Sequence, residues 1–415
     1  MLWLSPLLVL CGRTPSQTTQ LVKDINTTPV RPYTASQPEI SRSVSGLDQM
    51  RFVVMGGYAY FTATTFGSGE ELWRTDGTTG GTTIVKEINP GYFGSSPRDL
   101  TVAGSRIYFQ AYDRASGSEL WVTDGTATGT RLVADIVPGS KGSAPTSLAV
   151  LGSKVVFSAD DGKNGRELWI TDGTSTGTVL LKDIRPFAGS SDPTQCVADG
   201  SGKHVFFRAN DGNFGDELWI TDGTTSGTRL VKDINTGTSS LPSYIRPLGA
   251  SRVIFSARDL SAGQELWISD GTAAGTHIVK DIAPGSLRGT DFRLNIPLGS
   301  TAAKYVFRGN DGTRGDEWWV TDGTAAGTIL LRDVNPGPGA GSASEGCASA
   351  SGNLAYVSCH DGSAYSIWVT DGTVAGTKPI LHARRHRGAP IPPRTMAWGG
   401  SASPASTPGP GANPG

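Results

Sequence analysis

Charge is scarce in this chain, and long apolar runs are absent beyond its first residues. Asp, Glu, Lys and Arg make up 18% of the 415 residues, with a formal net charge of −1, whereas about 25% is usual. The one run of basic residues is Arg384-Arg385-His386-Arg387. This composition gives no electrostatic basis for binding nucleic acid or an anionic membrane. No apolar stretch reaches the roughly 20 residues that a transmembrane helix needs.

Cysteine and histidine are equally sparse. The four cysteines are too few for a disulfide scaffold; they are Cys11, Cys196, Cys347 and Cys359. Cys347 and Cys359 flank a predicted hairpin, so a bridge between them is one hypothesis for an oxidising compartment. The alternative is two free thiols, because Cys359 occupies a position where other repeats have Ala, for example Ala111, Ala159, Ala209 and Ala257. The five histidines are scattered and no Cys-x-x-Cys pattern accompanies them, so zinc has little support.

Repetition is what the chain has in abundance. Residues 167–174, Glu-Leu-Trp-Ile-Thr-Asp-Gly-Thr, are followed by Gly177-Thr178, and this pattern recurs along the chain. The repeats are centred on Trp73, Trp121, Trp169, Trp219, Trp267, Trp319 and Trp368, at spacings of 48, 48, 50, 48, 52 and 49 residues. A period held this closely indicates one supersecondary unit copied seven times.

Each repeat predicts four short strands separated by turn residues. In the third repeat these strands are expected near residues 147–151, 154–159, 167–172 and 178–184. The turns between them contain Gly152-Ser153, residues 160–165 and the Asp-Gly-Thr sequence. Asp accepts local backbone N–H bonds, and Gly adopts positive φ without strain, so both residue types favour tight turns.

The hairpin of the third and fourth strands permits a prediction of register. If Asp172 lies opposite Gly177, then Trp169 faces Leu180 and Glu167 faces Lys182. The same offset places opposite charges across the ladder in five of the seven repeats, and Trp opposite Leu or Ile in six. Such pairs contribute roughly 0.2–1 kcal/mol each. We therefore predict a cross-strand ion pair for the recurring Glu and a core position for the recurring Trp.

The last repeat departs from this pattern. Ser366 replaces the Glu and Pro379 falls opposite Trp368, so residues 378–382 are expected to make a poor fourth strand. Residues 21–25, Leu-Val-Lys-Asp-Ile, match the fourth strands of other repeats and precede the first full repeat. We predict that this N-terminal strand completes the last blade and closes a ring, because closure removes exposed sheet edges.

The predicted fold is all-β: a seven-bladed β-propeller of four-stranded antiparallel blades, covering residues 20–383. An open superhelical array of β-repeats is the alternative. Residues 1–19 are expected to be an export signal, since a short apolar run precedes polar residues. Residues 8–11 also resemble a lipoprotein cleavage box, although Leu10 is larger than such a box requires, so a lipid anchor at Cys11 stays open. Residues 384–415, rich in Pro, Gly, Ala and Ser, are expected to be disordered.

The seven copies resemble the bacterial repeat family named for its Glu-Leu-Trp-x-x-Asp-Gly-Thr motif. The resemblance covers about residues 49–377 and is specific, because the spacing from Asp-Gly-Thr to the following Gly-Thr is constant in all seven copies. Departures are minor: Trp318 replaces Leu, Ser269 replaces Thr, and Ser366-Ile367 replaces the usual Glu-Leu. The resemblance implies a secreted or surface bacterial protein of undetermined biochemical role, and it brings no catalytic residues with it.

The acidic residues are the obvious candidates for chemistry. The Asp of each Asp-Gly-Thr occurs seven times, which favours a role in the turn over a role in one asymmetric site. Loop carboxylates next to Gly are weak calcium candidates, because calcium prefers clustered oxygen ligands; they are Asp160, Asp161, Asp211 and Asp311. Plain turns are the alternative. Asp99 and Asp291, near the starts of their repeats, are weak candidates for a catalytic carboxylate. No catalytic or cofactor-binding residue is assigned, and no Gly-x-Ser-x-Gly or phosphate-binding loop occurs.

The sequence therefore favours a non-catalytic repeat protein, secreted or in the cell envelope of a bacterium, that acts as a monomeric binding or scaffolding module. An extracellular protein or a glycan is the expected partner. A propeller enzyme acting on glycans, a hydrolase or a lyase, is the alternative. Because loops on a rigid scaffold carry binding surfaces, we expect the partner to contact the varied connections between repeats; these contain Tyr92-Phe93, Phe187, Tyr244 and Leu287-Arg288.

Overall fold

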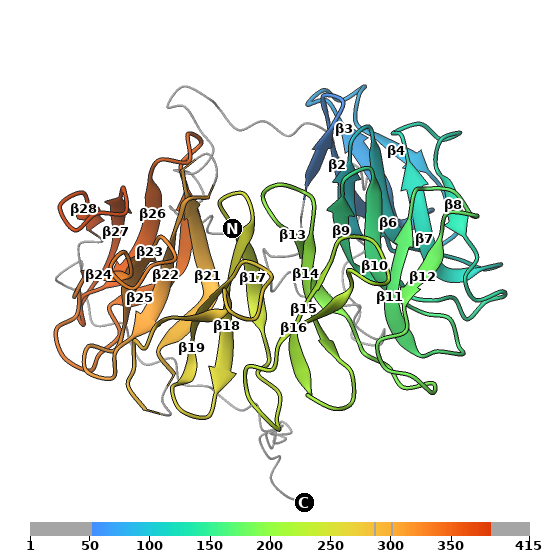
Figure 1. Ribbon diagram of the computed structural model, residues 1–415. Helices are drawn as coiled ribbons and strands as arrows, with labels where there is room; N and C mark the ends of the chain where they lie inside the picture. Colours follow the sequence, from blue (N-terminus) through green and yellow to red (C-terminus); the bar gives the residue numbers. More distant parts are fainter. Residues whose placement is uncertain (1–51, 286–287, 300–301, 383–415) are drawn as a thin grey trace, which may run out of the picture.

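The computed structural model describes residues 52–285, 288–299 and 302–382. In this part of the chain, 28 strands form seven four-stranded antiparallel sheets, and the strands of each sheet pair in chain order. The sheets follow one another around a common axis (Figure 1), and their first strands lie next to one another around it. The prediction of an all-β, seven-bladed propeller is confirmed. No helix in the described residues is long and apolar enough to cross a membrane.

The first four blades contain strands of three to eight residues. Their bounds are β1 (Val53–Met55), β2 (Tyr58–Thr65), β3 (Gly69–Thr75) and β4 (Thr83–Lys86); β5 (Arg98–Ala103), β6 (Arg106–Asp113), β7 (Gly117–Thr123) and β8 (Arg131–Ala134); β9 (Thr146–Leu151), β10 (Lys154–Asp160), β11 (Arg166–Thr171) and β12 (Val179–Lys182); β13 (Thr194–Ala198), β14 (Val205–Asn210), β15 (Asp216–Thr221) and β16 (Arg229–Lys232).

The last three blades repeat this order. Their strands are β17 (Ser243–Leu248), β18 (Arg252–Asp259), β19 (Gly263–Ser269) and β20 (His277–Lys280); β21 (Thr290–Leu298), β22 (Lys304–Asn310), β23 (Asp316–Thr321) and β24 (Ile329–Arg332); β25 (Ser342–Ala348), β26 (Ala355–His360), β27 (Tyr365–Thr370) and β28 (Lys378–His382). Two faces result. We call the face with the first-to-second and third-to-fourth strand turns the turn face. The opposite face, with the second-to-third strand loops and the connections between blades, is the loop face.

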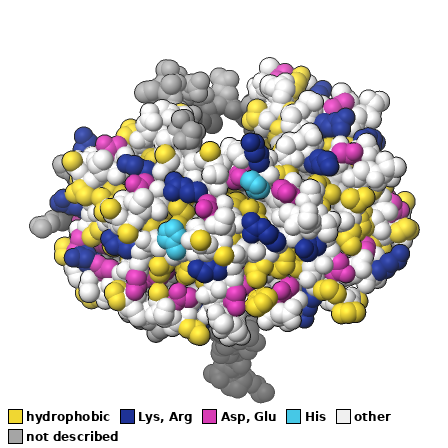
Figure 2. Space-filling view, in the orientation of Figure 1, with side chains coloured by type: hydrophobic (Ala, Val, Ile, Leu, Met, Phe, Trp, Pro, Cys, Tyr) yellow, Lys and Arg dark blue, Asp and Glu magenta, His cyan; other side chains and the backbone are white. Residues whose placement is uncertain are grey.

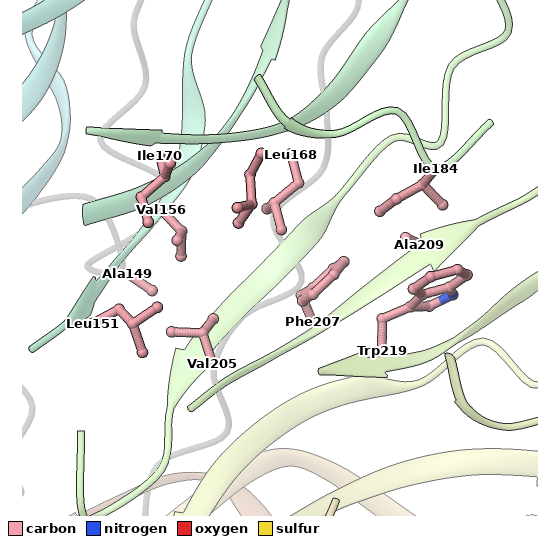
Figure 3. Packing of buried hydrophobic residues seen from close by; sticks show 11 residues of the cluster. Ala149, Leu151, Val156, Leu168, Ile170, Ile184, Val205, Phe207, Ala209 and Trp219 are labelled. Carbon is pink, nitrogen blue, oxygen red and sulfur yellow. The ribbon is translucent and has the colours of Figure 1, made fainter. Parts of the chain in front are cut away.

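The apolar core lies between blades. Figure 3 shows one of its clusters, in which Leu168 and Ile170 of the third blade pack against Phe207 and Trp219 of the fourth. Burying a side chain of this size stabilises the fold by about 1.5–3 kcal/mol. The described residues form six such clusters, one for each successive pair of blades, and none of these joins the last blade to the first.

Six of the seven recurring tryptophans belong to these clusters, as the sequence predicted, and Trp73 of the first blade is buried outside them. Trp169 lies opposite Leu180 on the fourth strand and opposite Phe157 on the second. The predicted pairing of Trp with Leu or Ile holds in six blades. Each of these Trp side chains is buried, which confirms that the motif aromatic is a packing residue.

The fourth strand of the last blade corrects a prediction. Residues 378–382 do form this strand, β28, which pairs with β27. Pro379 lies opposite Trp368 where the register shifts, so the irregular ladder accommodates a residue that has no N–H to donate. The N-terminal strand expected at residues 21–25 lies outside the described residues, as do the export signal with Cys11 and the tail from residue 384.

The hypothesis of a Cys347–Cys359 bridge is wrong. Cys359 is a free, buried thiol packed between the last two blades, and it lies opposite Ser342 and Ser366 in the sheet. Cys347 lies opposite Tyr356 instead. Burial raises the pKa of the Cys359 thiol to about 12. The alternative, a thiol at a packing position, holds for Cys359.

Candidate binding surfaces

The recurring Glu of the motif does not form the predicted ion pair with Lys. Between Leu168 and Trp169 the register shifts, so that Lys182 lies opposite Leu168 rather than Glu167. The outer strand holds one extra residue at this bulge, Leu181, whose side chain enters the core. Glu167 therefore lies beyond the end of the ladder with β12 and turns into the protein, where it is fully buried.

Glu167 instead holds the connection to the next blade. Its carboxylate accepts backbone N–H bonds from Ile184 at 2.8 Å and Ser191 at 2.9 Å, and a bond from Ser191 Oγ at 2.6 Å. Burial raises the pKa of Glu167 to about 7. Five other blades bury the equivalent Glu with a raised pKa; these residues are Glu71, Glu119, Glu217, Glu265 and Glu317. The motif carboxylate is thus a loop anchor.

The lysine that was expected to pair with Glu reaches the following blade. Lys232 Nζ donates to the backbone oxygen of Thr276 at 2.8 Å and lies 5.7 Å from the centre of the Trp267 ring. Lys86, Lys182 and Lys280 make the same bond to the corresponding threonine. Each contact joins the outer strand of one blade to the turn of the next, so these lysines stabilise the order of the blades.

The Asp of each Asp-Gly-Thr accepts hydrogen bonds within its own turn, as predicted. Asp172 Oδ1 accepts bonds from the backbone N–H of Thr174 at 2.8 Å and from its hydroxyl at 2.7 Å, and these bonds lower the pKa of Asp172. A Cβ atom at Gly177 would lie 2.1 Å from the same oxygen. The constant spacing from Asp-Gly-Thr to Gly-Thr therefore reflects the close approach of this carboxylate to a residue without a side chain.

The calcium candidates lie in separate loops of the loop face. Each carboxylate accepts bonds within its own turn: Asp160 from Gly162, Asp161 from residues 163 and 164, Asp211 from residues 213 and 214, and Asp311 from residues 313 and 314. Within the described ranges, no group of three His, Cys, Asp or Glu side chains is placed to hold a metal ion. These oxygens act as turn acceptors.

The two candidate catalytic carboxylates also have structural partners. Asp291 forms ion pairs with Arg288 at 2.9 Å and Arg308 at 3.8 Å. Asp99 Oδ2 accepts the backbone N–H of Ser147, on the first strand of the next blade, at 3.0 Å. The two carboxylates lie in the second and sixth blades and have different partners, so the structure does not bring them together into one catalytic site.

Asp99 belongs to a series of linked positions that the sequence did not reveal. Asp99, Ser147, Gln195 and Tyr244 have φ angles of 57°, 56°, 55° and 56°, which side-chain-bearing residues rarely adopt. Gln195 Oε1 accepts the N–H of Tyr244 at 2.5 Å, and Tyr244 OH accepts from Arg293 at 3.3 Å. The second to sixth blades each contribute a different side chain to this inner rim of the loop face, so this part of the rim is polar and asymmetric.

The loop face also carries exposed aromatic side chains. Phe66, Tyr92 and Phe93 of the first blade are 69%, 56% and 78% exposed, and their rings contact edge to face at centroid distances of 6.4 and 5.7 Å. Phe187, in the connection after the third blade, is 99% exposed. Tyr92-Phe93 and Phe187 were predicted in this role. Phe66 was missed, although the same loop of the fourth blade also carries an exposed aromatic residue, Phe214.

The turn face holds one feature that occurs in a single blade. The turn from β13 to β14 contains Asp199, whose buried carboxylate lies 3.0 Å from Nδ1 of His204. Burial alone would raise the pKa of Asp199, but hydrogen bonds from Ser201 and His204 outweigh it and lower the pKa. His204 appeared in the sequence only as a scattered histidine. Its position five residues after an Asp, inside a turn longer than that of the third repeat, was the available signal.

His204 borders a cleft of about 290 Å³ between the fourth and fifth blades. Asp222, Arg229 and Asp270 also line it, and Arg229 donates to the backbone oxygen of Gly271 at 2.8 Å. A second cleft of about 400 Å³ lies between the first and second blades and contains Tyr58, Tyr60 and Arg74 but no histidine. Figure 2 shows acidic and basic side chains interspersed over the visible side, without a large region of one sign.

Comparison with known proteins places the chain in a family. The chain is similar to a solved structure of puromycin hydrolase, with a TM-score of 0.45, 14% sequence identity, and coverage of 80% of this chain and 54% of that one. For a prolyl endopeptidase the TM-score is 0.48 and the identity 16%, with coverage of 80% of this chain and 49% of that one. For TolB from Acinetobacter baumannii the TM-score is 0.33 and the identity 12%, with coverage of 78% of this chain and 80% of that one. It spans about half the length of the first two. The comparison with curated proteins gave no match. A family model described as outer membrane protein assembly factor BamB matches residues 30–291. The chain, a propeller of seven four-stranded blades, therefore belongs to this BamB family.

Proposed function

We propose that this protein is a non-catalytic binding and scaffolding module of the bacterial cell envelope, and that its partner docks on the loop face. The observation that carries the proposal is the exposure of Phe66, Tyr92, Phe93 and Phe187 in varied loops, while the repeated Glu, Trp, Asp and Lys are used within the fold. Aromatic residues are enriched at the centres of protein interfaces. The family description, which names an assembly factor of outer membrane proteins, is consistent with a protein partner.

Within this family, we assign the chain to the bacterial group of Glu-Leu-Trp-x-x-Asp-Gly-Thr repeat proteins on the strength of its seven copies. Export, followed by residence at the cell surface or release, is part of the same proposal. It rests on the apolar start of the sequence and on the secreted or surface location that the resemblance to that group implies. Expression of the full chain in a bacterial host, followed by fractionation, tests export: retention in the cytosol with an uncleaved N-terminus would contradict it.

The partner surface is tested by site-specific photocrosslinking. A photoreactive residue at Phe93 should form a saturable adduct in envelope extracts, whereas the same residue at Val374, exposed on the turn face, should not. The triple variant F66S/Y92S/F93S should weaken the adduct formed from a probe at Phe187 without changing the melting temperature. Equal crosslinking from Phe93 and Val374, or an unaffected adduct in the triple variant, would contradict a loop-face interface.

One observation favours the second candidate function, an enzyme acting on glycans. The Asp199–His204 pair occurs in one blade only, next to its first strand, as a proton-transferring group would. Incubation of the protein with polysaccharides and detection of new reducing ends or unsaturated products tests this candidate. Absence of product at any pH between 5 and 8 would leave the binding module as the function.

A further inference from the structure

The turn that carries Asp199 and His204 has a structural counterpart in the last blade. Asp199 N–H donates to the backbone oxygen of His204 at 2.9 Å, and Ser349 N–H donates to that of Leu354 at 2.8 Å. Within each turn, a glycine N–H donates to the first residue, at 3.0 and 2.9 Å. In each case, the same glycine accepts a bond from the turn of the preceding blade, at 3.0 and 2.8 Å. The six-residue turn therefore forms without an Asp–His pair.

Since the turn does not require them, Asp199 and His204 call for another explanation. Asp199 is buried and accepts four hydrogen bonds, whereas the His204 side chain is 43% exposed beside the cleft. A carboxylate can only accept from the imidazole, so Nδ1 of His204 carries the hydrogen. When the ring is neutral, the other nitrogen, Nε2, is an acceptor held in a fixed orientation. Asp199 therefore orients His204 so that its Nε2 can accept a hydrogen bond at the cleft.

The remaining polar groups of the cleft are also mostly acceptors. Asp222 and Asp270 each use Oδ1 for their own turns, at 2.7–2.9 Å from the following threonine, and Oδ2 takes no part in those bonds. Two carboxylates disfavour an anion. Arg229, at the same cleft, disfavours a cation. Within the described residues, no group of three ligands suits a metal ion. A neutral ligand rich in hydroxyl donors satisfies these groups.

We infer that the cleft between the fourth and fifth blades binds one neutral sugar ring, with His204 Nε2 and the carboxylates of Asp222 and Asp270 as acceptors for its hydroxyl groups. The volume of about 290 Å³ lies just below the range of about 300–1,000 Å³ in which drug-sized ligands bind, so a single ring fits better than an extended chain. The inference concerns the turn face and holds independently of the partner on the loop face.

The full chain provides a matched test. Glucose, galactose and mannose, titrated singly to millimolar concentration and followed by NMR of the His204 ring, should include at least one that binds saturably. The double variant D199S/H204L copies Ser349 and Leu354 of the last blade and should keep the fold while weakening that binding at least tenfold. H204Q, which retains an acceptor, should lose less. L260S, an exposed change on the loop face of the fifth blade, should bind sugar as the unaltered protein does.

Three results would overturn the inference. None of the three hexoses binds saturably; or the folded D199S/H204L variant binds as tightly as the unaltered protein; or inorganic phosphate binds the cleft more tightly than any hexose. Loss of crosslinking from the loop face with intact sugar binding would instead count against the proposed partner surface alone. A reducing-end product formed at the cleft, and abolished in D199S/H204L, would support the inference and add catalysis to it.

Discussion

The fourth and seventh blades share one sheet topology and one type of six-residue turn, yet they connect to the rest of the molecule differently. In the fourth blade, Glu217 anchors the following loop and Lys232 reaches the fifth blade. In the seventh, Ser366 stands in place of the Glu and accepts a bond from Trp368 Nε1 at 2.8 Å, and Leu381 stands in place of the Lys. The motif therefore has two parts: Trp and Asp-Gly-Thr build a blade, and Glu and Lys join it to the next.

What the two blades share supports this division. Trp219 and Trp368 lie at the same ladder position, although one faces Leu230 and the other Pro379. Both blades keep the paired threonine hydroxyls that close the turn, at 2.7 Å. The seventh blade keeps the parts that build a blade and lacks the Glu and the Lys that join the fourth blade to the next. Variants that give the fourth blade the residues of the seventh test the two roles separately.

The largest effect is expected for Glu217→Ser. The change leaves the buried N–H groups of Ile234 and Ser240, now bonded at 3.1 and 2.8 Å, without an acceptor. Each unsatisfied donor costs about 1–3 kcal/mol, so the free energy of unfolding should fall by about 3 kcal/mol or more, as measured by urea denaturation. Glu217→Gln keeps one acceptor oxygen, so its free energy of unfolding should fall by less. Equal losses in the two variants would mean that Glu217 does not act as a loop anchor.

The second prediction concerns pH. Burial raises the pKa of Glu167, Glu217, Glu265 and Glu317 to about 7, above the ordinary value of 4.5, so the native state binds more protons than the unfolded chain between these values. Stability from these groups is full below pH 4.5 and is lost as the pH rises through 7. The denaturation midpoint should therefore decrease from pH 5 to pH 8.

The motif aspartates change stability with pH in the opposite direction, but they do so at a lower pH than the glutamates. Hydrogen bonds lower their pKa values below 3.8, for example that of Asp222, so their contribution is complete above that pH. Glu217→Gln removes one of the four glutamates and should flatten the decrease between pH 5 and pH 8. A midpoint that rises over this range, or a slope unchanged in Glu217→Gln, would contradict the assignment.

Lys232→Leu, which copies Leu381, should have a smaller effect. The variant loses the bond to Thr276 and the contact with the Trp267 ring, together worth about 1–2 kcal/mol. The second blade provides the reverse change, because Ala134 lies at the equivalent position opposite Leu120. Ala134→Lys should raise the unfolding midpoint. If neither variant shifts it, the lysine contacts do not couple the blades.

The smallest effect, equal in the fourth and seventh blades, is expected for substitution of the turn aspartates. Asp222→Ala and Asp371→Ala each remove the bonds to the following threonine, at 2.9 and 2.7 Å in both blades. Because both turns lie on the surface with the same geometry, the two variants should lower the melting temperature by the same small amount. A much larger loss in the fourth blade would show that the Asp also joins blades, contrary to the division drawn above.

Local pattern predicted the blade and its packing residues well. The register of Trp169 with Leu180 follows from a turn of fixed length, and the turn itself is specified by Asp172 and Gly177 a few residues apart. The same reasoning failed for Glu167, because it assumed an unbroken ladder. A bulge of one residue shifts every later side chain. It moved Lys182 past its expected partner.

The candidate surfaces were less accessible to prediction. The exposed Tyr92-Phe93 and Phe187 could be named in advance, because an aromatic residue in a varied Gly-rich loop has little to pack against. The Asp199–His204 pair could not, since a hydrogen bond across a turn depends on how the turn folds. The inner rim of the loop face, with Asp99 and Gln195, could not be predicted either. Its hydrogen bonds join residues of neighbouring blades that are 48 or 49 positions apart in the sequence.

The sequence by itself determined the seven-fold unit, the core position of the tryptophans and the chemistry of the Asp-Gly-Thr turn, because these depend on periodicity and on interactions within a few residues. The tertiary structure alone decided the partners of Glu and Lys and the setting of His204 at a cleft. Those partners come from a loop or a blade about 20 to 50 residues away. Such contacts exist only once the sheets have packed around their axis and the ladder bulges have set which way each side chain points.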